Sequence, residues 1–129
     1  MNPAHTIMRQ SEFESAFVGL RTILEKHSKR LVVTADSPGH YCLSVEFSPR
    51  LGKGYPVAWV KTGKAYVSFH FMPVYMFPKL LGGVSKELRK RMQGKSCFNF
   101  KVRDDSLFEE LEQLTTKGLS ACRDAGFAS

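Results

Sequence analysis

A thiol and an imidazole are the residues of this sequence best suited to covalent chemistry. Cys97 needs a nearby base and an electropositive surrounding to act as a nucleophile, and His70 is the candidate base. The sequence does not fix the distance between them, and a lone histidine beside aromatic residues is more often structural than catalytic. The other candidate groups are Tyr75, His40 and Tyr41. We therefore predict no catalytic residues and rank an enzyme dependent on cysteine and histidine as the weakest of three hypotheses.

The sequence carries no recognisable metal or cofactor motif. The three cysteines, at positions 42, 97 and 122, are not arranged as CxxC or with the Cys/His spacing of a zinc site. The glycine-containing segments 52–54 and 82–83 lack the pattern of a phosphate-binding loop. We predict reduced thiols, no metal site and no cofactor.

Positive charge is concentrated in the middle of the chain. The formal net charge is +7, which favours anionic partners through long-range attraction. Segment 86–103 holds seven basic residues and one acid, and segment 48–64 holds four basic residues and no acid. The acids gather in the first and last segments. This distribution predicts a basic surface between two more acidic terminal helices.

Hydrophobic periodicity predicts the elements that position these residues. An amphipathic helix over about 12–27 follows the capping box formed by Ser11 and Glu14. The later elements are strands over 31–35, 41–47, 55–60 and 65–71, an irregular elbow over 73–78, a short basic helix between Ser85 and Gly94, a strand over 96–101, and a helix capped by Asp104 or Asp105. Short connections between the first four strands predict an antiparallel meander.

These elements predict a two-layer α+β domain. An antiparallel sheet of about five strands packs on the N- and C-terminal helices, with the short basic helix before the last strand. Residues 1–10 form a loose arm in this prediction, and residues 11–129 form one domain. No apolar run is long enough for a membrane helix, and the first residues lack the apolar core of a signal peptide. We expect a cytoplasmic protein that does not contact membranes.

Four segments carry a family resemblance at the level of pattern over residues 12–122. They are the LRTIL stripe of the first helix, the YVSFHFMP strand and elbow, the ELRKRMQGKSCFNF passage and the closing DDSLFEELEQLTTKG helix. The arrangement resembles the YjbR/CyaY-like (frataxin-like) superfamily and, within it, the YdhG-type small domains of unknown function. The Gly-Met-Pro segment usual in that type is replaced here by DSPGHY.

The relatives imply two different roles. The frataxin-like resemblance implies iron handling through an acidic helical ridge, which the basic body of this chain does not fit because hard cations need clustered carboxylates. The YjbR-like resemblance implies DNA binding, which the basic middle fits better.

Strand alternation predicts a sheet face that is left open by the helices and carries aromatic and cationic side chains. If the apolar positions 67, 69 and 71 face the helices, Tyr66, Ser68 and His70 face the other side. The predicted binding residues are Trp59, Tyr66, Ser68, His70, Tyr75, Arg89, Lys90, Arg91, Lys95, Asn99 and Lys101. Aromatic rings and cations suit base stacking and phosphate neutralisation. The leading hypothesis is a non-enzymatic domain that binds nucleic acid or another anion.

A third hypothesis uses the same aromatic residues differently. The elbow over 72–77 is apolar enough to line a small-molecule cleft, and methionine adapts to varied ligand shapes. A two-fold homodimer through the open face would bury the predicted aromatics instead. The sequence does not decide between these alternatives.

Overall fold

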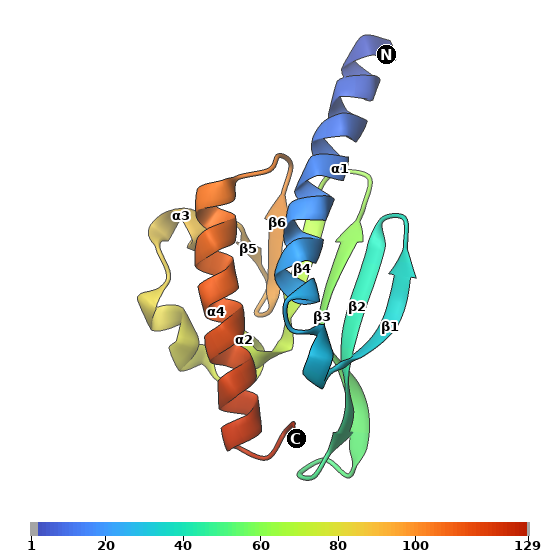
Figure 1. Ribbon diagram of the computed structural model, residues 1–129. Coiled ribbons are helices and arrows are strands. Elements are labelled where there is room, and N and C mark those ends of the chain that lie inside the picture. Colours follow the sequence, from blue (N-terminus) through green and yellow to red (C-terminus); the bar gives the residue numbers. More distant parts are fainter. Residues whose placement is uncertain (1–2, 129) are drawn as a thin grey trace.

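One six-stranded antiparallel sheet forms the back layer of the molecule in the computed structural model, in which residues 3–128 are described (Figure 1). The strands lie in the order β1-β2-β3-β4-β6-β5. Their bounds are β1 (Val32–Ser37), β2 (His40–Ser48), β3 (Lys53–Thr62), β4 (Val67–Phe71), β5 (Met92–Gln93) and β6 (Cys97–Phe100). The first four form the predicted antiparallel meander. The α+β fold class is confirmed, with six strands rather than five.

Two long helices, α1 (Pro3–Glu25) and α4 (Asp105–Asp124), cover the same face of this sheet (Figure 1). The predicted apolar stripes of both helices are buried. Helix α1 begins at Pro3, so residues 3–10 are helical where the sequence predicted a loose arm, and the pair Ser11 and Glu14 lies inside the helix. Proline is favoured in the first turn of a helix, and no residue between it and Ser11 breaks one. Residues 1–2 of the predicted arm lie outside the described part of the chain.

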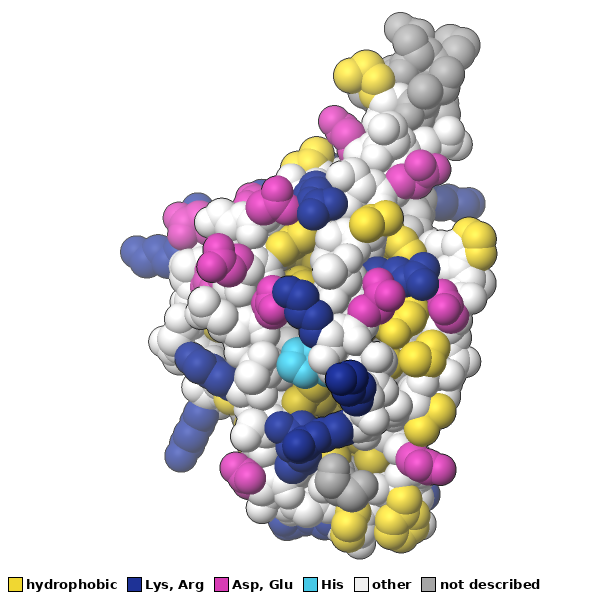
Figure 2. Space-filling view, viewed as in Figure 1, with side chains coloured by type: hydrophobic (Ala, Val, Ile, Leu, Met, Phe, Trp, Pro, Cys, Tyr) yellow, Lys and Arg dark blue, Asp and Glu magenta, His cyan; other side chains and the backbone are white. Residues whose placement is uncertain are grey.

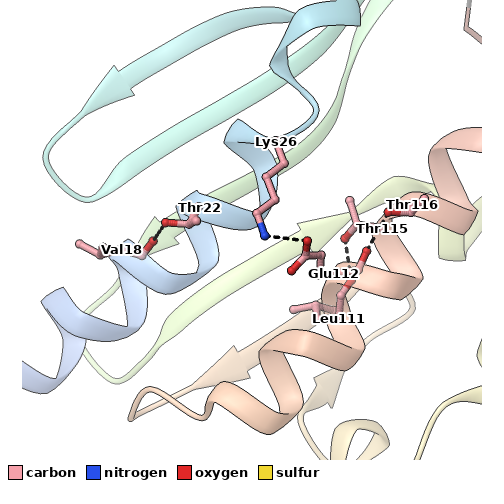
Figure 3. A network of polar contacts seen from close by, with 7 residues as sticks. All are labelled: Val18, Thr22, Lys26, Leu111, Glu112, Thr115 and Thr116. Carbon is pink, nitrogen blue, oxygen red and sulfur yellow. Dashed lines mark hydrogen bonds and ion pairs between the residues drawn. The ribbon is translucent and has the colours of Figure 1, made fainter.

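Apolar packing rather than charge holds α1 against α4. Lys26, just after α1, donates to Glu112 of α4 over 2.7 Å (Figure 3). Both side chains are partly exposed, and exposed ion pairs contribute about 0.2–1 kcal/mol. The threonine hydroxyls in the same view donate to carbonyls of their own helices. The leucine and phenylalanine stripes beneath therefore supply most of the contact energy.

Strands β4 and β6 send alternate side chains to opposite faces of the sheet. Val67, Phe69 and Phe71 are fully buried under the helices. In β6, Phe98 is fully buried and Phe100 is almost fully buried. The residues between them, at positions 68, 70, 97 and 99, are half-buried on the other face. The alternation that the sequence predicted is confirmed for both strands.

The segment between β4 and β5 is more ordered than predicted. The elbow contains a short helix, α2 (Met72–Met76), and a 3-10 helix, η2 (Pro78–Gly83). The basic helix α3 (Lys86–Arg89) is a single turn, because the residues after it leave the helix to form β5. Proline at the first positions of α2 and η2 pre-sets the backbone for these turns.

The N-cap residue of helix α3, Ser85, is held by a side chain from a distant helix. The Ser85 hydroxyl accepts from the backbone NH of Leu88 over 3.2 Å, as predicted. Leu88 occupies the position where a capping box has glutamate. Glu110 of α4 takes that role, accepting from the backbone NH of Ser85 (2.6 Å) and from its hydroxyl (2.8 Å). One carboxylate therefore fixes the basic turn to the core layer.

Gly118 of α4 is required because the helix lies directly on β4. A Cβ at this position would meet the Phe71 ring and lie 2.9 Å from the Cβ of Pro73. We expect Gly118→Ala to lower the free energy of unfolding by about 1–3 kcal/mol, since overpacking a core forces its neighbours to move. Urea unfolding followed by circular dichroism measures the change.

Gly82→Ala is the matched control, because nothing lies within 4 Å of a Cβ there. It should change stability by about 0.5 kcal/mol or less. Equal effects of the two substitutions would contradict the close approach of α4 to β4.

Candidate functional site

A stacked pair of aromatic rings stands on the open face of the sheet, opposite α1 and α4. Trp59 of β3 lies directly across from His70 of β4. Their ring centroids are 4.8 Å apart and the ring planes differ by 12°. Both side chains are only half-buried. The open face therefore presents a pre-arranged aromatic platform; the sequence predicted that both residues lie on this face but not that their rings stack.

A chain of hydrogen bonds continues from this platform across β4, β6 and β5. Ser68 donates to the Asn99 side-chain oxygen over 2.9 Å. Asn99 donates to Gln93 over 2.8 Å, and Tyr66 donates to the same Gln93 oxygen over 3.2 Å. Three predicted residues thus meet in one network through Gln93. These hydrogen bonds fix the positions of the three side chains relative to one another.

Cys97 and His70 do approach each other. The Cys97 sulfur lies 3.7 Å from Nε2 of His70 and donates to the Asn99 oxygen over 3.2 Å. Burial raises the pKa of Cys97. Burial, together with the positive charge of Lys61, lowers the pKa of His70. Both shifts favour the neutral forms, a thiol beside an imidazole, over a thiolate beside an imidazolium.

A basic hollow of about 310 Å³ lies beside this network at the β5 edge. Its walls combine three cations with uncharged polar side chains and one methionine, and they include no acid: Tyr66, Lys90, Arg91, Met92, Gln93, Asn99 and Lys101. The Arg91 carbonyl accepts from the backbone NH of Asn99 over 2.8 Å, which ties the basic residues to the sheet. Five predicted binding residues meet here. By contrast, Figure 2 views the helix side, where acidic and basic side chains are interspersed.

The other three predicted binding residues line a different recess. Tyr75, Arg89 and Lys95 line a larger, mostly apolar groove of about 950 Å³ beside α2 and η2. The sequence placed all eleven residues in one site, but the one-turn helix α3 divides the cations. Arg89 lines the groove, whereas Lys90 and Arg91 line the basic hollow.

Gln93 is the residue that sequence reasoning missed. It accepts two of the hydrogen bonds that organise the network. It was assigned to the end of the basic helix, before Gly94, because a strand of two residues shows no alternation. The sequence predicts that Cys97 is a reduced thiol or a weak candidate nucleophile, whereas the structure places it in contact with His70 and Asn99 within the network.

Neither a metal centre nor a membrane span emerges from the part of the chain that the structure describes. His70 and Cys97 form a pair, and within residues 3–128 no cluster of three or more His, Cys, Asp or Glu side chains could hold an ion. None of the described helices is both long and apolar enough to cross a bilayer.

No protein-family model, curated protein or solved structure matches this chain. The resemblance to the YjbR/CyaY-like superfamily therefore stays a prediction. Any statement about activity has to be argued from the site itself.

The raised pKa of Cys97 predicts slow alkylation. We expect iodoacetamide to modify Cys97 more slowly than free glutathione at neutral pH, because the thiolate fraction is reduced. Timed quenching and peptide mass spectrometry would follow all three cysteines separately. His70→Asn should not slow the reaction further. Modification faster than glutathione that is lost in His70→Asn would restore the enzyme hypothesis.

The lowered pKa of His70 predicts a loss of stability in mild acid. The unfolded chain takes up a proton near pH 6.5, before the folded chain does, so stability is complete above that pH and falls as pH drops below it. His70→Phe keeps a ring beside Trp59 and should flatten this dependence in urea unfolding measured at several pH values. His27→Gln is the comparison, because burial also lowers the pKa of His27. An unchanged slope in His70→Phe would contradict the assignment.

Proposed function

We propose that this domain is a non-enzymatic module that binds nucleic acid, or an anion of comparable chemistry, across the open sheet face. The observation that carries the proposal is the basic hollow, which is lined by three cations and by no acidic residue. The aromatic platform of Trp59 and His70 lies on the same face of the sheet. Phosphate groups are bound by such cations, assisted by uncharged donors such as Tyr and Asn.

We assign the role of each binding residue according to where it lies on the open face. Lys90, Arg91 and Lys101 would neutralise phosphates at the β5 edge, and Lys61 adds positive charge near His70. The Trp59–His70 pair would contact bases or sugars farther along the face. Ring contacts of this kind need unpaired bases, so a single strand should bind more tightly than a duplex.

This proposal agrees with the DNA-binding role implied by the YjbR-like resemblance. It needs no catalytic residue, which accords with the neutral state of the Cys97 thiol. We place the protein in the YjbR/CyaY-like superfamily as part of the same proposal.

The test is a titration of Trp59 fluorescence, since Trp59 is the single tryptophan of the chain. Short single-stranded and double-stranded oligonucleotides would be added at low and at moderate salt. We expect quenching, tighter for the single strand, that weakens steeply as salt rises because counterions are released from phosphates. A triple variant with Lys90→Gln, Arg91→Gln and Lys101→Gln removes three proposed phosphate contacts. We expect it to bind the oligonucleotide roughly tenfold or more weakly at low salt, with an affinity that depends less steeply on salt concentration.

The matched control removes three charges elsewhere. Lys29 and Arg30 lie in the 3-10 helix η1 (Ser28–Arg30) and Lys117 in α4, all exposed. Their replacement by Gln should weaken binding far less, although net charge falls equally. No response to either oligonucleotide at low salt, or equal losses in both triple variants, would sink the nucleic-acid proposal.

The alternative explanation for the partly exposed rings of Trp59 and His70 is a homodimer that forms through the open face. It predicts a mass of about twice 14.6 kDa by light scattering. A dimer that dissociates in a Trp59→Ala variant, with no oligonucleotide response, would replace the proposed function.

A further inference from the structure

The apolar groove beside α2 is a second recess that the proposed function does not use. It holds about 950 Å³, which lies in the range of about 300–1,000 Å³ typical of small-molecule sites. Three of the chain's five methionines line it, at positions 72, 76 and 92, together with Tyr75 and Phe127. Methionine side chains are flexible and polarizable, so they adapt to an apolar ligand.

One wall of the groove is built in advance by the C-terminal segment. The Phe127 ring lies 4.9 Å from the Arg50 guanidinium and packs edge-on against Phe77, with 6.1 Å between ring centroids. Tyr55 donates to the Phe127 carbonyl over 3.0 Å, and the backbone NH of Arg50 donates to the Gly126 carbonyl over 3.0 Å. These contacts fix Phe127, so a ligand would meet a preformed wall rather than order one.

The charged residues that line the groove are both basic. They are Arg89 and Lys95, and no acidic residue lines it. Arg89 donates to the Leu81 carbonyl over 2.8 Å, which holds its guanidinium beside the groove. An apolar wall with two unopposed cations is complementary to an apolar molecule that carries a negative charge at one end.

We propose that this groove binds a small amphiphilic anion, an apolar body with one acidic group, taken up as a free monomer. The apolar body contacts the methionines and Phe127, and the acidic group lies between Arg89 and Lys95. The groove shares Met92 with the basic hollow but shares no charged residue with it. Its occupation therefore neither requires nor excludes nucleic-acid binding.

Methionine methyl NMR tests the proposal directly, with decanoate below its micelle concentration as the probe. We expect the methyl signals of Met72, Met76 and Met92 to shift on titration. The signal of Met8, on α1, and the indole NH of Trp59 should stay in place. Decanol and decyltrimethylammonium, which share the chain but lack the negative charge, should bind more weakly.

Two single substitutions test the charge complementarity. Lys95→Gln and Arg89→Gln should each weaken decanoate binding by roughly two- to fivefold, the effect of an exposed charge pair, and leave decanol binding unchanged. Lys95→Gln is the cleaner variant, because Arg89 also contacts Leu81. Lys90→Gln and Arg91→Gln are matched controls from the same segment, and they should change oligonucleotide binding but not decanoate binding.

Several results would overturn the inference. The proposal is contradicted if decanoate shifts none of the three groove methionine signals, or if decyltrimethylammonium shifts them equally. Shifts that require vesicles of phosphatidylglycerol rather than free decanoate would assign the groove to a lipid surface instead of a free monomer. A negative result with decanoate does not affect the expected response of Trp59 fluorescence to oligonucleotides. The two proposals can therefore be contradicted independently.

Discussion

The packing of four phenylalanines under the helices is the constraint on which the rest of the molecule depends. Phe69 and Phe71 of β4 and Phe98 and Phe100 of β6 all point into the space beneath α1 and α4. Because side chains alternate along a strand, this packing forces the intervening residues onto the opposite face. Register then places Trp59, His70 and Cys97 in one row. The composition of the open face is therefore a consequence of core packing.

Helix α3 divides the positively charged segment between two surfaces of different chemistry. On one side, cations join amides and hydroxyls in a polar hollow. On the other, they border an apolar groove. The division follows from the length of the helix, because the chain leaves the helical path after a single turn to pair with β6. A continuous helix through residue 93, as the sequence predicted, would have produced one basic ridge instead.

The parts predicted from sequence are those governed by local periodicity. The two apolar stripes, the alternation in β4 and β6, and the caps at Ser85 and Asp104 all follow from patterns within a few residues. The errors arise where distant contacts decide the structure. Strand β5 exists because β6 lies beside it, and Gln93 is held by Asn99 of β6 and by Tyr66, which immediately precedes β4. The start of α1 was missed because Ser11 and Glu14 match a capping box, although such a pair is also compatible with a helix interior.

The hydrogen bonds between Glu110 and Ser85 also have a consequence for the order of folding. A helix of one turn has no stability of its own, and its acceptor for the Ser85 NH lies 25 residues later in the chain. The Glu110 part of this cap can therefore form only after α4 has docked on the sheet. In a chain that emerges from the ribosome N-terminus first, the sheet and α1 are synthesised before this event. The contacts of Glu110 with Ser85 are then among the last contacts of the domain to form.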